Sequence, residues 1–128
     1  MLKSVLNGGP SDTRPFKKRF DFEERKALSD KHKKSHPDHV VVICERGSGS
    51  TLHPIAKNRF SVDSSSKFGS FVATVRDMLA LQEDESIFMY VADVVIPPYM
   101  TTMGELYGKY ADDDGFLYVR YQEENVFG

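Results

Sequence analysis

The last fifteen residues of the chain, Asp114–Gly128, read DGFLYVRYQEENVFG, and the rest of the sequence is interpreted outward from them. The pair Asp114-Gly115 predicts a tight turn, because glycine reaches positive φ without steric penalty. Residues 116–121 are aromatic, β-branched or leucine apart from Arg120, which predicts a strand. Alternation divides its side chains between two faces, with Leu117, Val119 and Tyr121 on one and Phe116, Tyr118 and Arg120 on the other.

Gly128 can be interpreted in two ways. At the end of a flexible tail, an unhindered glycine carboxylate suits an enzyme that must activate that carboxylate inside a narrow channel. A glycine is equally at home in a frayed chain end, and taken alone it favours this simpler interpretation. Evidence from other segments of the sequence is needed to choose between a conjugation site and a frayed chain end.

Length and composition exclude several classes of protein. The 128 residues are enough for one domain with its own core. No apolar run approaches the ~18 residues of a membrane span, and no apolar signal segment opens the chain. The single cysteine, Cys44, excludes an internal disulfide and fits a reducing compartment. We therefore expect a cytosolic or nuclear protein.

The charge is divided unevenly along the chain. Residues 1–39 carry ten Lys/Arg against six Asp/Glu, a net charge of +4, whereas residues 40–128 carry seven against thirteen, a net charge of −6. A basic segment could meet anionic membrane, RNA or acidic proteins, although a solvated helix face is the simpler interpretation. No exposed aromatic platform accompanies the lysines, so we expect no nucleic-acid partner.

The chain before residue 40 divides into two parts. Residues 1–13 contain Gly8-Gly9-Pro10-Ser11 and no apolar period, which predicts a flexible N-terminal extension. Residues 14–39 predict a helical subdomain, whose first short helix, over 16–19, can be opened by Pro15.

A longer charged helix should complete this subdomain. Asp21 and Glu24 form an acidic variant of the capping box, which predicts a helix over residues 22–35. Its apolar face is thin and consists mainly of Phe22, Ala27 and Leu28. We expect this helix to pack onto the domain rather than form its centre.

Residues 40–124 predict the folded core. Val40–Cys44 is a strand that is apolar on both faces, so both faces should be covered, and the N-terminal helices could supply the second layer. A short loop leads to a strand over 58–62, which favours an antiparallel hairpin. A helix from Lys67, capped by Ser65 or Ser66, has the clearest core face in the chain: Phe68, Phe71, Val72, Val75 and Leu79.

The remaining elements complete the order α-α-β-β-α-β-α-β. Ser86–Val91 predicts a strand, and Thr102 with Glu105 forms a capping box for a short helix through Tyr110. We expect this helix to bury Met103, Leu106, Tyr107 and Tyr110. The order matches the ubiquitin-like β-grasp, an α+β fold in which a mixed four-stranded sheet wraps the long helix, here with two additional N-terminal helices.

The sequence contains no credible active site, metal site or cofactor site. His32 and His36 have a spacing that can bind zinc, with His39 nearby, but solvated surface histidines are the simpler interpretation. Cys44 lies in an apolar strand and is expected to be buried packing rather than a nucleophile. The acidic run 112–114 fails the calcium-loop spacing. We therefore assign no catalytic residue and no metal ligand.

Three stretches together resemble the autophagy ubiquitin-like modifiers, the family that includes GABA-receptor-associated protein and microtubule-associated light chain 3. They are Phe22–Ala27, Val42–Glu45 and Asp114–Gly128, with Ser86–Val91 and Pro97-Pro98 in the expected order. The resemblance covers about residues 16–128. Its last stretch is the most specific and makes Gly128, in a conjugation tail of residues 125–128, the expected site of lipid conjugation.

The resemblance implies a carried group rather than an enzyme. A processing cysteine protease, which can also deconjugate, exposes the glycine. An activating enzyme adenylates it, and a conjugating enzyme transfers it to phosphatidylethanolamine. The protein would be cytoplasmic, and peripheral on autophagosomal membranes when lipidated. Since this chain already ends at glycine, we expect that no trimming is needed or that this is the trimmed form.

The resemblance also implies that autophagy receptors dock an extended aromatic-x-x-aliphatic peptide against the second strand. By family position the aromatic pocket is lined by Val41, Ile43, Arg59 and Phe116, and the aliphatic pocket by Phe60, Val62 and Val75. Lys57 and Arg59 should favour acidic residues beside the motif. Ile43, Phe60 and Val75 are equally typical of an ordinary core.

The sequence departs from the family pattern at the expected docking site. His32 stands where an aliphatic residue is common, and Ser61 replaces the leucine between the two pockets, a loss of about 1–3 kcal/mol of apolar contact if that site is buried. The other departures are Leu28 for an acid, Val41 and Asp63 for prolines, and Met78 for a basic residue. We expect an altered or weaker motif preference.

Two other functions remain open. A sister ubiquitin-like modifier attached to a protein lysine would share the glycine but not the lipid. A non-covalent β-grasp adaptor would bind peptides with a tail that is never activated. Deleting Gly128 should abolish membrane puncta of a lipid-conjugated modifier and leave the peptide binding and localisation of an adaptor untouched.

Overall fold

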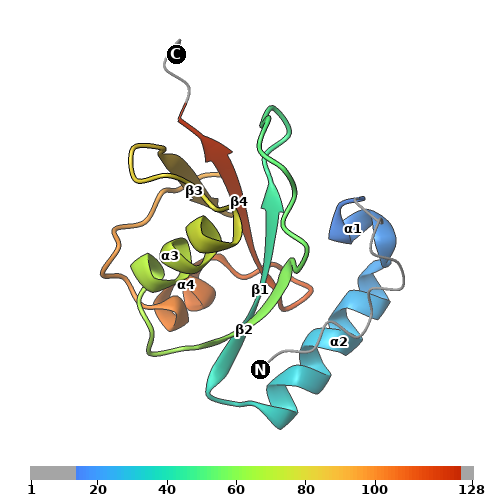
Figure 1. The fold of residues 1–128 in the computed structure, drawn as a ribbon. Coiled ribbons are helices and arrows are strands. Elements are labelled where there is room, and N and C mark those ends of the chain that lie inside the picture. Colours follow the sequence, from blue (N-terminus) through green and yellow to red (C-terminus); the bar gives the residue numbers. More distant parts are fainter. Residues whose placement is uncertain (1–13, 125–128) are drawn as a thin grey trace.

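The computed structural model describes residues 14–124, so the predicted extension (1–13) and tail (125–128) lie outside the described residues. The elements follow the predicted order and confirm the α+β class (Figure 1). They are α1 (Phe16–Arg19), α2 (Phe22–Ser35), β1 (His39–Arg46), β2 (Arg59–Asp63), α3 (Phe68–Met78), β3 (Ile87–Val91), α4 (Met103–Tyr110) and β4 (Leu117–Glu123).

The four strands form one mixed sheet in the order β2-β1-β4-β3. β1 pairs antiparallel with β2 and parallel with β4, and β4 pairs antiparallel with β3. β4 runs beyond the predicted residue 121, because Gln122 and Glu123 pair with Phe88 and Ile87 of β3. Helices α3 and α4 cover one face of the sheet, and α1 and α2 cover the other (Figure 1).

The main core lies between the sheet and α3. The face of α3 predicted from helical spacing is buried as expected, since Phe68, Phe71, Val72, Val75 and Leu79 are all at most 4% exposed. They pack with Val40, Val42 and Cys44 of β1 and with Leu117, Val119 and Tyr121 of β4. The two-residue alternation predicted for the last strand is therefore confirmed.

A second apolar cluster fills the opposite face of the sheet. Val41 and Ile43 of β1 pack there with Phe116 and with Phe16 of α1. The rings of Phe16 and Phe116 meet edge to face, with centroids 5.0 Å apart. This cluster explains why β1 is apolar on both faces and confirms that the N-terminal helices supply the second cover.

The sequence led us to expect a thin apolar face on helix α2, but most of that face is not buried in the structure. Phe22 is 45% exposed, Ala27 is also exposed, and only Leu28 is partly buried. The buried residues are instead Arg25 and Ser29. A helix this charged has too few apolar side chains to bury a stripe, so it is held by hydrogen bonds to the turn before β4.

The start of α3 corrects a second expectation. Neither Ser65 nor Ser66 caps this helix, whose N-cap residue is Lys67, without a side-chain cap. The first helical N–H groups, of Phe68 and Gly69, donate instead to the carbonyls of Thr101 (2.7 Å) and Tyr99 (2.9 Å). A neighbouring segment thus satisfies the donors that a serine would otherwise take.

Both predicted capping boxes are present, at Asp21/Glu24 of α2 and Thr102/Glu105 of α4. In α4, Met103 and Leu106 are buried as expected. Tyr107 and Tyr110 are only partly buried, because their hydroxyl-bearing rings lie at the margin of the core.

Candidate functional site

Strand β2 lies at an edge of the sheet, and residues 14–124 place no strand beyond it. At the other edge, the chain partly covers β3 itself, since Val91 N donates to Val95 O at 2.7 Å. An unpaired edge presents backbone N–H and C=O groups that can accept another strand. The edge of β2 is therefore the stronger candidate for binding an extended peptide.

The hydrogen-bond ladder shows which residues of β2 face outward. Cys44 N donates to Asn58 O at 2.8 Å, and Ser64 N donates to Asp38 O at 3.0 Å. Bonded and non-bonded pairs alternate along an antiparallel ladder, so the backbone groups of the intervening odd-numbered residues point away from β1. These outward residues are Arg59, Ser61 and Asp63.

The residues expected in the aromatic pocket are brought together on one face of the sheet. Val41, Ile43 and Phe116 are 5%, 0% and 1% exposed and form the floor of the second cluster. The ladder pairs Ile43 with Arg59, which places Arg59 beside them at the edge. Phe16 covers this floor, and sequence reasoning missed it, although a phenylalanine directly after Pro15 was a usable signal.

The residues expected in the aliphatic pocket lie on the opposite face. Phe60 and Val75 belong to the main core, where the Phe60 ring meets Phe71 edge to face at 5.2 Å. Val62 is partly buried and packs against the same core. The Lys57 ammonium lies 5.2 Å from the centroid of the Phe60 ring, so it sits on this side of β2.

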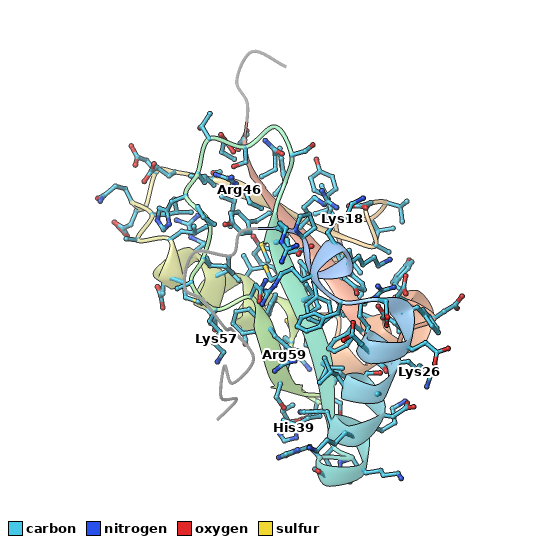
Figure 2. All side chains as sticks on the ribbon, turned by 90° about the vertical axis from the view of Figure 1, so that its right-hand side faces the viewer. Lys18, Lys26, His39, Arg46, Lys57 and Arg59 are labelled. Carbon is cyan, nitrogen blue, oxygen red and sulfur yellow. The ribbon has the colours of Figure 1, made fainter. Side chains whose placement is uncertain are left out.

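Permanent positive charge lies along the edge. Figure 2 labels two permanent cations, Lys57 and Arg59, together with His39, on the side of the molecule that carries β1, β2 and α2. Burial, and then the neighbouring Arg19, lower the pKa of Arg59 below its ordinary value. A guanidinium nevertheless keeps its proton at neutral pH, so the edge favours carboxylates.

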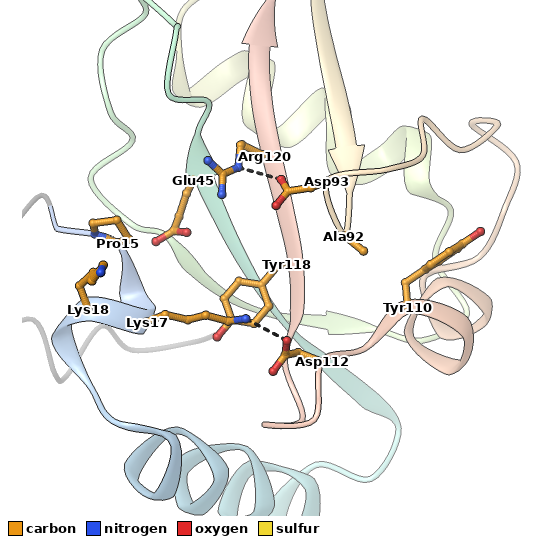
Figure 3. A pocket seen from close by; sticks show the side chains of 10 residues that line it. All are labelled: Pro15, Lys17, Lys18, Glu45, Ala92, Asp93, Tyr110, Asp112, Tyr118 and Arg120. Atoms are coloured by element: carbon orange, nitrogen blue, oxygen red, sulfur yellow. Dashed lines mark hydrogen bonds and ion pairs between the residues drawn. The ribbon is translucent and has the colours of Figure 1, made fainter.

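A cavity of about 340 Å³ lies between α1 and β4, lined by residues that include Lys17, Glu45, Tyr118 and Arg120 (Figure 3). Lys17 pairs with Asp112 at 2.9 Å, and Arg120 pairs with Asp93 at 3.0 Å. These lining charges neutralise one another, so the cavity offers no clear preference for a charged ligand.

The described residues offer no catalytic constellation or metal site. Cys44 is fully buried, and burial followed by the charge of Glu45 raises the pKa of its thiol far above the ordinary value. Within residues 14–124, no group of three or more His, Cys, Asp or Glu could hold a metal ion. No helix of this part of the chain is long and apolar enough to cross a membrane.

The end of β4 is firmly held at the point where the tail begins. The Glu123 carboxylate accepts hydrogen bonds from Ser50 Oγ (2.6 Å), Thr51 Oγ1 (2.6 Å) and Thr51 N (2.8 Å). The bonds from Ser50 and then from Thr51 lower the pKa of Glu123 to about 2. Gly128 itself lies outside the described residues.

A family model described as autophagy protein Atg8 ubiquitin like matches residues 24–128. The chain belongs to the Atg8 family. Autophagy-related protein 8 of Schizosaccharomyces pombe is 36% identical over 113 residues, which cover 88% of this chain and 93% of the relative. The Kluyveromyces lactis protein of the same name is 39% identical over 113 residues, covering 88% and 90%. The crystal structure of Trypanosoma brucei ATG8 matches with a TM-score of 0.81 and 33% identity, covering 90% of this chain and 98% of that chain.

His32 and Ser61, two residues that we expected to differ from the family pattern, contact each other in this chain. His32 Nε2 and Ser61 Oγ are 2.8 Å apart, so a polar pair joins α2 to the edge strand β2. Both side chains are only partly buried. Neither could have been paired with the other from sequence, because nothing local links a residue of α2 to one of β2.

Proposed function

We propose that this Atg8-family chain is a ubiquitin-like modifier that is conjugated through Gly128 to phosphatidylethanolamine on autophagosomal membranes. It recruits receptors that carry an aromatic-x-x-aliphatic motif. The unconjugated protein is cytoplasmic, and the lipidated form is peripheral on the membrane. Residues 40–124 form the ubiquitin-like core, residues 14–39 a helical subdomain, and residues 125–128 the conjugation tail.

The conjugation half of the proposal is supported by the family match, which runs through residue 128. The activating enzyme uses ATP to convert the Gly128 carboxylate to an acyl adenylate, releasing pyrophosphate. An enzyme cysteine displaces AMP to form a thioester, which passes to the conjugating enzyme. The lipid amine attacks that thioester, forms an amide and releases the thiolate. The chain itself supplies only the carboxylate, so it needs no acid, base or nucleophile of its own.

The docking half is carried by the open edge of β2. An extended peptide pairs with the outward backbone groups of Arg59 and Ser61, and its alternate side chains point to the two faces of the sheet. The face with Val41, Ile43 and Phe116 receives the aromatic residue, and the face with Phe60, Val62 and Val75 receives the aliphatic one. Lys57 and Arg59 attract acidic residues beside the motif.

A reconstituted conjugation reaction tests the first half. The chain is incubated with the activating and conjugating enzymes, ATP and phosphatidylethanolamine liposomes, and its intact mass is measured beside a Gly128-deleted control. The expected result is a gain of one lipid that the control lacks. A thioester without lipid transfer would favour a protein-conjugated modifier. No thioester would make the chain a non-covalent adaptor.

A peptide titration tests the second half independently of the tail. A fluorescent aromatic-x-x-aliphatic peptide with acidic flanks should bind the full chain and the Gly128-deleted chain equally. A peptide whose two anchor residues are alanine serves as the matched control. Equal binding of both peptides would contradict docking through the motif.

A further inference from the structure

Three histidines from two elements form one cluster beside the docking edge. The ring of His32 on α2 stacks on that of His36, the C-cap residue of this helix, with centroids 4.7 Å apart and planes inclined by 20°. His39, the first residue of β1, meets His36 edge to face at 5.9 Å. His36 is exposed, whereas His32 and His39 are partly buried, so solvent reaches the cluster.

The cluster is attached directly to β2. His32 Nε2 lies 2.8 Å from Ser61 Oγ, and the ladder pairs His39 with Asp63 at the end of the strand. Ser61 is also one of the residues whose backbone groups face outward. A peptide added along this edge would therefore pass beside the cluster.

The charges around the cluster decide how it responds to protons. Burial, and then the charges of His36, His39 and Arg59, lower the pKa of His32 below its ordinary value. β2 contributes the cation Arg59 and the anion Asp63, and Asp63 lies near His39. Hydrogen bonds from Ser65 N and Ser65 Oγ, both 2.8 Å, lower the pKa of Asp63, so it is ionised at neutral pH. Without a ligand, most of these neighbours oppose protonation of His32.

We propose that the histidine cluster makes docking on β2 proton-linked, so that a segment carrying carboxylates beside Ser61–Asp63 binds with uptake of a proton. The proposal rests on the docking function proposed above. A carboxylate within about 4–6 Å of a histidine favours its charged form. It adds negative charge beside His32, whose protonation the nearby cation Arg59 opposes, whereas Asp63 pairs with His39 in the ladder. The partner is thus an acidic extended peptide rather than a neutral one.

The sign of the effect follows from linkage. The bound state holds more protons than the free state, so binding tightens as the pH falls toward the range in which histidines are charged. We expect the dissociation constant of an acidic peptide to fall about three- to tenfold between pH ~7.5 and ~5.5, which corresponds to an average uptake of about a quarter to half a proton. Peptide carboxylates remain ionised over this range.

Calorimetric titration of the full chain tests this. Two aromatic-x-x-aliphatic peptides are compared, one with Glu and Asp beside the motif and one with Gln and Asn. Titrations in two buffers of different ionisation enthalpy count the protons taken up, without reference to any variant. His36→Gln removes the exposed central ring, and His32→Gln keeps a group that can bond to Ser61. His53→Gln, which changes an exposed histidine outside the cluster, is the matched control.

We expect proton uptake with the acidic peptide only, reduced in His36→Gln and His32→Gln and retained in His53→Gln. Binding of the acidic peptide with the same affinity at all pH values and no proton uptake would overturn the inference and leave docking intact. Equal proton uptake with the neutral peptide would overturn it as well. Failure of both peptides to bind at any pH would overturn docking itself and this inference with it.

Discussion

Arg25 Nε donates to Asp114 Oδ2 at 2.8 Å, across 89 residues of sequence, and so joins α2 to the turn before β4. The Asp114 side chain is fully buried, and Arg25 is 11% exposed. Asp114 also accepts from Tyr118 OH (2.6 Å) and Phe116 N (2.9 Å). Every oxygen of this carboxylate is therefore used, which is the condition under which a buried charge is tolerated.

Breaking this pair should destabilise the chain strongly. Arg25→Ala leaves the Asp114 charge buried without its cation, and we expect a loss of about 3–5 kcal/mol in the free energy of unfolding. Lys26→Ala is the matched control, because Lys26 pairs with Asp30 at 2.6 Å on the surface and should cost about 0.5 kcal/mol or less. Urea unfolding measures both, and similar losses would contradict a structural role of the buried pair.

Gly115 should tolerate no side chain. Its φ is +88°, and a Cβ there would clash with Ser29 Oγ and lie 2.9 Å from Ser29 Cβ. We expect Gly115→Ala to cost about 1–3 kcal/mol or more, from backbone strain together with the displacement of α2. In Gly108→Ala, inside α4, the new Cβ meets no atom within 4 Å, and about 0.5–1 kcal/mol of stabilisation is expected. Thermal unfolding of the two variants should shift in opposite directions.

Acidification should destabilise the free protein through His32. Its pKa is lowered by burial and then by His36, His39 and Arg59, so the unfolded state binds a proton more readily than the folded state. This contribution to stability is present above the unfolded pKa of about 6.5 and is lost as the pH falls below it. Urea midpoints at several pH values should show a smaller loss for His32→Gln than for the wild type. His53→Gln should behave as the wild type.

The outward N–H of Ser61 should be essential for docking. Ser61→Pro removes that donor but no hydrogen bond to β1, so the sheet should persist. The dissociation constant of the peptide should rise at least about tenfold. Ser61→Leu should strengthen binding of a motif peptide with neutral flanks, by about 1–3 kcal/mol, because it restores apolar contact at the edge. Unchanged affinity in Ser61→Pro, with a native circular dichroism spectrum, would exclude strand addition at β2.

Much of the fold followed from local patterns. The apolar run Val40–Cys44 predicted a strand covered on both faces. Alternation in Phe116–Tyr121 and helical spacing in α3 identified core faces, and the two capping boxes located the starts of α2 and α4. These signals act within a few residues, so they survive in the sequence alone. The fold class came from the order of the elements.

The features that the sequence did not predict all depend on contacts between segments that are distant along the chain. Arg25 is one charge among many in α2, and Asp114 is one of three consecutive acids, so nothing local marks them as partners. The cap of α3 is supplied by the backbone of Tyr99 and Thr101. The predicted docking residues were assigned from the family resemblance, but the cover provided by Phe16 required the packed structure.

The parallel pairing of β1 with β4 places the start of β1 and the end of β4 at opposite ends of the sheet. β1 begins at His39, and Glu123, the last residue of β4, lies at the opposite end of the sheet (Figure 1). The eight residues of β1 span about 23 Å at the usual rise of a strand. That distance is several Debye lengths at physiological salt, roughly 8 Å each. On a chain anchored beyond Glu123 with its sheet standing upright on the lipid, the histidines would lie outside the ionic layer at the surface and would respond to the pH of the bulk solution.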